Sequence, residues 1–143
     1  MREILFKAKR IDNGEWIEGS LIDLDIDSGY YYIVQPYKQA STLPIGFLIT
    51  DGMKLVDPKT LCQFAGLCDK NGKRIWENDV VWLVYDGKER IYQIVWDNSE
   101  LDFKATNGEE NYGSNFEYLL CCDEIEVVGN IFDNKELLQE GYK

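Results

Sequence analysis

Acidic residues alternate with apolar ones in a short segment whose spacing is that of a calcium ligand set. Asp23, Asp25 and Asp27 have the D-x-D-x-D pattern with which an EF-hand loop begins. Such a loop also needs glycine at its sixth position and a bidentate glutamate at its twelfth, where this chain has Ser28 and Val34. The alternation instead predicts a strand with its three carboxylates on one solvated face, which makes them a candidate partner surface.

The four cysteines do not have the spacing of a zinc site. Cys62 and Cys68 stand too far apart, Cys121 and Cys122 are adjacent, and the chain has no histidine. Zinc ligands usually come as C-x-x-C pairs, often with histidine. We therefore expect no metal and no other cofactor, and thiols that stay reduced in the cytoplasm.

The chain has few of the residue types that enzymes use as general bases or activated nucleophiles. Without histidine the chain lacks the commonest general base. Asp123 and Glu124 follow the adjacent cysteines, and their charges would raise the pKa of a thiol there. Paired catalytic carboxylates of the glycosidase kind come from distant positions in the sequence and are brought together only by the fold. The sequence alone therefore leaves open whether the chain has such a pair. The prediction is a protein that is not an enzyme, with an enzyme of unidentified type as the least favoured alternative.

The charge balance points to protein partners. The net charge is -11 and the sequence pI is about 4.4, so the chain repels nucleic-acid phosphates at long range and favours basic partners. We predict a protein-interaction module that forms a homo-oligomer or offers an acidic surface to an unknown partner. The alternative is a nucleic-acid-binding module that stacks bases on an aromatic set. This set comprises Trp16, Tyr30, Tyr31, Tyr32, Tyr37, Trp76, Trp82, Tyr92 and Trp96.

Alternation with a period of two and frequent turn residues predict a mostly β fold. The hairpin of residues 80–85 and 90–96, joined by Asp86-Gly87-Lys88-Glu89, is the clearest pair. Only the C-terminus looks helical, with Asp133 or Asn134 as its cap. Residues 35–46 and 97–118 are expected to be loops, the second with one short strand at 101–105, and the segment 115–122 is left open between helix and strand. The other predicted strands are residues 4–11, 16–27, 30–34 and 124–132, with Gly129 as a bulge in the last.

Two breaks lie close together in the middle of the chain. Asn71 and Gly72 belong to a D-K-N-G-K turn, in which both residues tolerate left-handed backbone conformations. Asn78 and Asp79 form a second corner, where the aspartate accepts backbone N–H bonds. Residues 74–76 are expected to be a short apolar link. These four residues are predicted to be structural, because sharp corners between short strands are typical of a small barrel.

The residues around these corners resemble the signature of the YopX-like family. The stretch TLCQFAGLCDKNGKRIWENDVV, residues 60–81, follows the family's form T-x-x-Q-Y/F-T-G-L-x-D-x-N-G-x-x-I-Y/F-E-G-D-I-V. The start MREILFKA, the segment VWDN at 95–98 and the segment IEVVGNIFDN at 125–134 match in the same order. Ala65 replaces the usual threonine and Asn78 the usual glycine. Asparagine is the residue after glycine that best holds a left-handed backbone, so the corner should survive.

The resemblance implies a phage or prophage protein without an established activity, and no catalytic residue comes with it. It implies a β-rich α+β fold in a single domain of residues 1–143. Within it, an N-terminal β subdomain spans about 1–60, and an SH3-like barrel with a short C-terminal helix spans about 61–143. The chain has no apolar run of membrane-spanning length, and its N-terminus lacks the apolar core of a secretion signal, so we expect no membrane contact and a cytoplasmic protein.

Overall fold

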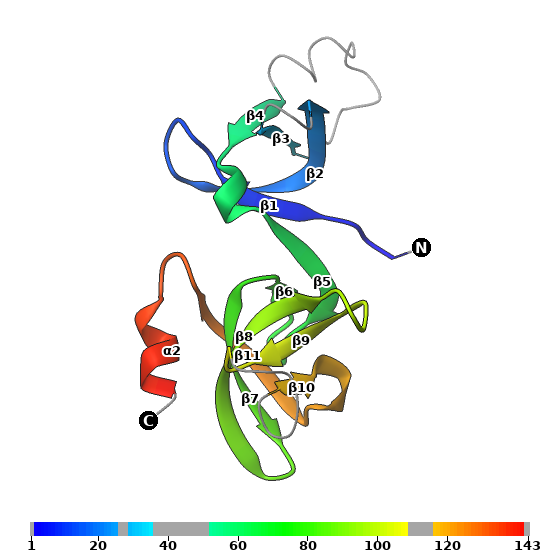
Figure 1. Ribbon diagram of the computed structural model, residues 1–143, viewed down its shortest axis with the longest axis vertical. Helices are drawn as coiled ribbons and strands as arrows, with labels where there is room; N and C mark the ends of the chain where they lie inside the picture. Colours follow the sequence, from blue (N-terminus) through cyan, green and yellow to red (C-terminus); the bar gives the residue numbers. More distant parts are fainter. Residues whose placement is uncertain (1, 26–28, 36–51, 109–115, 142–143) are drawn as a thin grey trace. The chain divides into compact units, whose positions relative to one another are not determined.

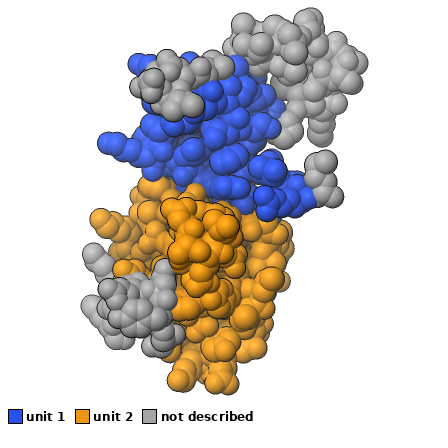
Figure 2. Space-filling model, turned by 45° about the vertical axis from the view of Figure 1, so that its right-hand side comes forward, with its two compact units in different colours: residues 1–64 blue, residues 65–143 orange. Residues whose placement is uncertain are grey.

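The chain folds into strands that belong to two compact units. The computed structural model describes residues 2–25, 29–35, 52–108 and 116–141. The units comprise residues 1–64 and 65–143, coloured separately in Figure 2. The strands form two antiparallel sheets (Figure 1). Among the described residues no helix is long and apolar enough to span a membrane.

The first unit is built on a meander of short strands. Its elements are β1 (Phe6–Lys9), β2 (Trp16–Asp25), β3 (Tyr30–Val34), β4 (Met53–Val56), the 3-10 helix η2 (Pro58–Thr60) and the start of β5 (Cys62–Cys68). Gly14, with φ +72°, turns the chain between β1 and β2. An isolated bridge between Arg10 and Val56 brings β4 back to the end of β1. The strands enclose a small core of Ala8, Ile17, Ile33 and Val56.

The second unit contains a five-stranded sheet in the order β10-β9-β8-β7-β11. Its core comprises Ile75, Val81, Leu83, Tyr92, Ile94, Ala105, Leu119 and Ile125. The β7–β8 turn is Asp86-Gly87, whose φ values of 49° and 74° are those of a tight hairpin turn. The elements of this unit are β6 (Arg74–Trp76), β7 (Asp79–Tyr85), β8 (Lys88–Asp97), β9 (Asp102–Thr106), β10 (Phe116–Tyr118), the 3-10 helix η3 (Leu119–Cys121), β11 (Glu124–Asn130) and the helix α2 (Glu136–Gly141).

The mostly β class and the short C-terminal helix are confirmed. The first sheet has the order β4-β3-β2-β1-β5-β6, with β5 continuing from the first unit into the second. Neither sheet closes into a barrel among the described strands, so the SH3-like detail stays a prediction. The predicted bulge is confirmed, because the register of β11 against β7 shifts between Val127 and Gly129.

Two segments differ from the expectation. Residues 74–76, expected to be a link, form strand β6. The expected loop of residues 97–118 contains the short strand predicted at 101–105, which is β9, but also a second strand, β10, that was not predicted, and the chain continues into η3 after Tyr118. Both corrections have one reason: pairing with a neighbouring strand stabilises segments that are too short or too rich in turn residues to be recognised alone. The expected loop at 35–46 lies outside the described residues apart from Gln35.

Candidate functional site

A buried aspartate fixes the first of the two corners. The Asp69 side chain, in a residue only 8 % exposed, accepts three backbone hydrogen bonds. Its Oδ1 lies 2.9 Å from the amide nitrogens of Asn71 and Lys73, and its Oδ2 lies 2.9 Å from that of Val127 on β11. Burial raises the pKa of Asp69, but the three N–H groups together outweigh it, so this pKa lies below its ordinary value. The carboxylate therefore joins the turn to a strand far along the chain.

Asn71 and Gly72 lie within this turn. Gly72 has φ +80° and donates its amide hydrogen to the Asp69 carbonyl oxygen at 3.0 Å. Asn71 donates through Nδ2 to Glu126 Oε1 at 3.3 Å. The Lys70 amide donates to the Ile125 carbonyl at 3.0 Å. The turn is thus attached to β11 by main-chain and side-chain bonds to Ile125, Glu126 and Val127.

The second corner is held by Asn78 and Asp79. Asn78 has φ 70°, donates its amide hydrogen to the Ile94 carbonyl at 2.8 Å and accepts the Ile131 amide at 3.0 Å. Asp79 is 2 % exposed, and its Oδ2 accepts the Trp76 amide at 2.8 Å. These bonds connect the corner with β6, β8 and the segment after β11. The structure places all four predicted corner residues at turns, where their polar groups bond the backbone or neighbouring side chains.

The three predicted surface aspartates are only partly described. Asp23 is exposed and lies opposite Tyr31, and Asp25 lies opposite Tyr30 at the end of β2. The β2–β3 register shifts between these two aspartates, so the strict alternation is interrupted there. Asp27 lies outside the described residues.

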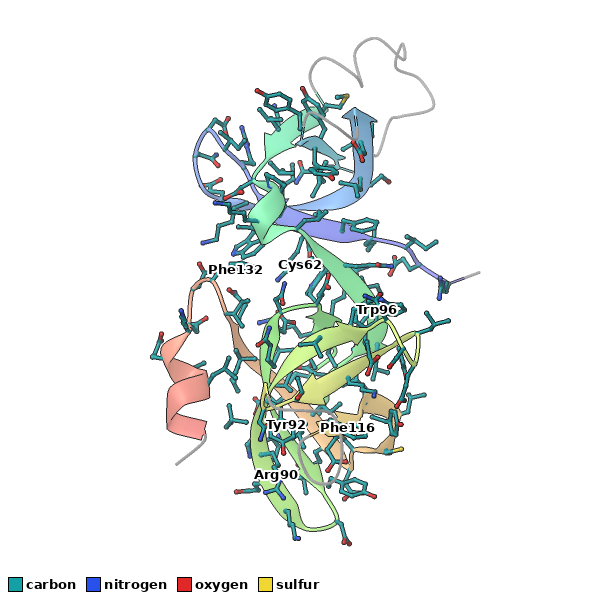
Figure 3. All side chains as sticks on the ribbon, viewed as in Figure 1. Cys62, Arg90, Tyr92, Trp96, Phe116 and Phe132 are labelled. Atoms are coloured by element: carbon teal, nitrogen blue, oxygen red, sulfur yellow. The ribbon has the colours of Figure 1, made fainter. Side chains whose placement is uncertain are left out.

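A fully buried lysine in the second unit is not expected from the sequence. Lys104 on β9 is 0 % exposed, and its Nζ lies 2.8 Å from Asp97 Oδ2 and 3.0 Å from Glu100 Oε1. The same nitrogen lies 4.4 Å from the centre of the Phe116 ring, labelled in Figure 3, and 5.3 Å from that of Tyr118. We call Lys104 and its four partners the Lys104 cage; the partners are Asp97, Glu100, Phe116 and Tyr118. The i, i+4 spacing of Glu100 and Lys104 and the aromatic pair at 116 and 118 are its only sequence signals.

The contacts within the cage keep its lysine and its two carboxylates ionised at neutral pH. Burial lowers the pKa of Lys104, but its hydrogen bonds to the two carboxylates raise it by more than burial lowers it. The pKa of Lys104 therefore lies above its ordinary value. The hydrogen bond from Lys104, followed by those from Ser99, lowers the pKa of Asp97. The Tyr118 hydroxyl, 2.7 Å from Oε2, and then Lys104 lower the pKa of Glu100. At neutral pH the lysine is therefore an ammonium ion, which suits holding β10 against β9 and not nucleophilic chemistry.

A second group of titratable side chains surrounds Tyr92. The Arg90 guanidinium hydrogen-bonds the Tyr92 hydroxyl, and burial raises the pKa of Tyr92. Burial also raises the pKa of Glu117, opposed by the charge of Arg90. Burial raises the pKa of Cys122 to about 12, and the negative charge of Glu117 is the second cause of this rise. The tyrosine and the cysteine of this group are thus kept neutral at physiological pH.

The four cysteines, all among the described residues, form no disulfide, and no group of three metal-ligating side chains gathers in that part of the chain. Cys62 is buried, and its Sγ lies 3.2 Å from the Thr60 carbonyl oxygen as a donor. Cys122 is half-buried, whereas Cys68 and Cys121 are exposed. The thiols therefore divide into an accessible pair and a protected pair.

We expect a disulfide reagent such as Ellman's to modify Cys68 and Cys121 quickly in the native protein and Cys62 and Cys122 only on unfolding. Burial shields Cys62, and a pKa near 12 leaves Cys122 with about a thousandth of the thiolate of an ordinary thiol. Mass spectrometry of the labelled peptides checks the assignment. Fast native labelling of Cys122 would contradict the described environment.

The acidic charge is concentrated in the second unit. Residues 65–143 contain 17 Asp and Glu against 8 Lys and Arg, whereas residues 1–64 contain 9 against 7. One of the eight cations, Lys104, is enclosed and does not reach the surface. Exposed carboxylates lie near both hairpin turns of the second sheet: Asp86, Glu89, Asp123 and Glu124 near the β7–β8 turn, and Glu100 and Asp102 near the β8–β9 turn.

Comparisons with known proteins give a family and a fold. The family model described as YopX protein matches residues 5–139, which confirms the resemblance. A solved structure, the crystal structure of protein EF1440 from Enterococcus faecalis, is similar with a TM-score of 0.54 and 21 % sequence identity. The match covers 96 % of this chain and 99 % of that one. At this identity the likeness shows the fold alone. A search of curated proteins found no match.

Proposed function

The chain belongs to the YopX protein family, and from this premise we propose that it is a protein-interaction module whose acidic second unit binds a basic partner. The observation that carries the proposal is the separation of charge: the second unit has nine more acidic than basic residues, the first only two. Charge of one sign on one part of a molecule steers and selects partners of the other sign.

The state of the titratable groups supports binding over catalysis. General acids and bases work best with a pKa near the working pH. The Lys104 cage instead moves the pKa values of Asp97 and Glu100 down and that of Lys104 up, and the pKa of Cys122 reaches about 12. The pKa of Glu117, which burial raises, is the one shift among these side chains that goes toward neutral pH. The polar residues of the family signature bond the backbone at two corners. We therefore propose that the chain is not an enzyme.

The remaining parts of the proposal follow from the family resemblance and the charge. In a phage or prophage setting the partner is a host or phage protein in the cytoplasm. The sharp corner at Asn78 and Asp79 and the five-stranded antiparallel sheet support an SH3-like second unit. Self-association through this unit brings like charges together, so we favour a different, basic protein over a homo-oligomer.

The test is affinity capture from a lysate of the natural host with the tagged full chain, at about 50 mM and about 500 mM NaCl. We expect one basic protein to be retained at low salt and released at high salt. The triple variant Glu89→Gln, Asp102→Asn, Glu124→Gln removes three exposed charges of the second unit and should reduce its capture at least about fivefold.

A matched control removes the same charge from the first unit. Glu3→Gln, Glu15→Gln, Glu18→Gln also replaces three exposed carboxylates and should leave capture unchanged. Retention of background proteins only, or equal losses in the two triple variants, would reject the proposal.

One observation favours nucleic acid as a second candidate partner. The Nζ atoms of Lys7 and Lys9 on β1 lie 4.7 and 5.4 Å from the centre of the Trp16 ring on β2, which places cations and an aromatic face together on the less acidic unit. The chain should then retard the migration of single-stranded oligonucleotides in a gel at low salt, and the Trp16→Ala variant should retard them less. No shift at the lowest salt would remove this candidate.

A further inference from the structure

The turn between β8 and β9 is defined by a network of hydrogen bonds. Asp97 Oδ1 accepts the backbone amides of Ser99 at 2.8 Å and Glu100 at 3.1 Å. The Asp97 carbonyl accepts the Leu101 amide at 2.8 Å, and Asp102 then pairs with Asp97 across the hairpin. The position of Leu101 at the end of this turn is therefore fixed by the backbone.

Leu101 is an unusual residue for this place. Its φ of 56° lies in the left-handed region, which is unfavourable for a residue with a Cβ. Its side chain gains little from packing among the described residues, because the residue is 73 % exposed. Glycine or asparagine would suit the backbone better. An exposed leucine in this conformation contributes little to the stability of the turn, which is consistent with a contact to another molecule.

Two aromatic residues near the turn are partly exposed and held in place. Trp96, labelled in Figure 3, is 40 % exposed, and its ring centre lies 5.0 Å from that of Phe103. Its Nε1 donates to Asn98 Oδ1 in the turn at 2.6 Å. Tyr118 is 37 % exposed and donates its hydroxyl to Glu100. Side chains that are already ordered lose less entropy on binding, which is typical of the aromatic anchors of interfaces.

The charges around these side chains are negative. Glu100 and Asp102 are exposed next to Leu101, whereas the cation of this region, Lys104, is fully enclosed in its cage. We call Leu101 and Tyr118 with Glu100 and Asp102 the hairpin-tip surface. Trp96 does not belong to it, because it lies opposite Phe103 and therefore on the other face of the sheet from Lys104 and Tyr118. It offers apolar contact area with carboxylates beside it.

We propose that the hairpin-tip surface is the docking site for a basic peptide segment of the partner, in which an apolar side chain packs on Leu101 and a neighbouring lysine or arginine pairs with Asp102. Both oxygens of Glu100 are already bonded, to Lys104 and Tyr118, so Glu100 adds negative charge beside the site. This inference rests on the proposed function and gives it a location. Charge complementarity selects this occupant, because a second copy of the chain would bring the same carboxylates against each other.

The test starts from a displayed library of short random peptides selected against the full chain. We expect enriched peptides to carry lysine or arginine next to leucine or an aromatic residue. The best peptide is then synthesised, and its affinity is measured by isothermal titration calorimetry. Leu101→Gly should weaken binding at least about tenfold while the melting temperature stays the same or rises, because the left-handed strain is relieved. A side chain with a purely structural role would not give this combination.

Val128→Ala is the matched control, since Val128 is an aliphatic residue, 40 % exposed, on β11 at the opposite edge of the same sheet. It should bind the peptide as the unchanged chain does. Basic peptides that bind Leu101→Gly and the unchanged chain equally would overturn the site and leave the proposed function standing. Enrichment of no basic peptide would overturn both. A dimer that dissociates on Leu101→Gly, seen by sedimentation, would overturn the choice of occupant.

Discussion

Replacing Gly19 with alanine is expected to lower the free energy of unfolding of the first unit by about 3 kcal/mol. Gly19 is buried in β2 opposite Phe6. A Cβ at this position would overlap the carbonyl oxygen of Val34, and it would lie 2.8 Å from the Val34 carbonyl carbon and 3.1 Å from the Gln35 Cα. These are backbone atoms of the neighbouring strand, which cannot rotate away as a side chain does. Urea unfolding followed by tryptophan fluorescence measures the loss.

Gly14→Ala separates this steric effect from backbone conformation. Gly14 lies in the β1–β2 turn with φ +72°, and a Cβ at this position would have nothing within 4 Å. Its substitution should cost about 1 kcal/mol, from the left-handed backbone alone. Equal losses for the two variants would show that β2 and β3 do not approach each other as closely as described.

Replacing Asp69 with alanine is expected to destabilise the second unit by about 2–3 kcal/mol. The substitution leaves three backbone N–H groups without their acceptor and releases the turn from Val127 on β11. Asp69→Asn should cost nearly as much, because its amide NH₂ would have to face an N–H donor. Asp102→Ala, which removes an exposed carboxylate from the same unit, should change stability by less than about 0.5 kcal/mol. Denaturant unfolding of the three variants makes the comparison.

The effect of Asp69 should also depend on pH. Its folded-state pKa is lowered, so its contribution to stability is complete above the unfolded-state pKa of about 4 and is lost as the pH falls through the lower folded-state pKa. The difference in unfolding free energy between the unchanged chain and Asp69→Asn should therefore shrink below about pH 4. A difference that stays constant down to about pH 2 would mean that the carboxylate charge is not what the three N–H groups bind.

Local turn chemistry makes part of this fold predictable. The hairpin around Asp86-Gly87-Lys88-Glu89 can be predicted because these turn residues stand between two segments rich in β-branched and aromatic residues. The structure narrows the turn to Asp86-Gly87, both with positive φ, because β8 already begins at Lys88. Gly129 can be predicted as a bulge because glycine inside a strand marks a crowded place. A Cβ there would lie 2.6 Å from Asn134 Oδ1. Such features depend on residues that are near one another in the chain.

Features that depend on distant pairing are not predictable in this way. The local bonds of Asp69 follow from its turn, but its bond to Val127 joins residues 58 positions apart. The Lys104 cage forms only when β8, β9 and β10 lie side by side, and β10 occupies a segment whose turn residues indicate a loop. A lysine in a short strand is ordinarily expected in solvent. Only the register that places it opposite Tyr118 reveals that it is enclosed.

The attachment of the first corner to β11 has a consequence for solubility. On the side of β11 that faces away from β7, the Val127 amide is bound by Asp69 and the Ile125 carbonyl by the Lys70 amide. Main-chain groups at the rim of a sheet are otherwise templates onto which a foreign chain adds, as in fibrils. With these two groups already engaged, this part of the β11 edge offers fewer main-chain groups to an added strand.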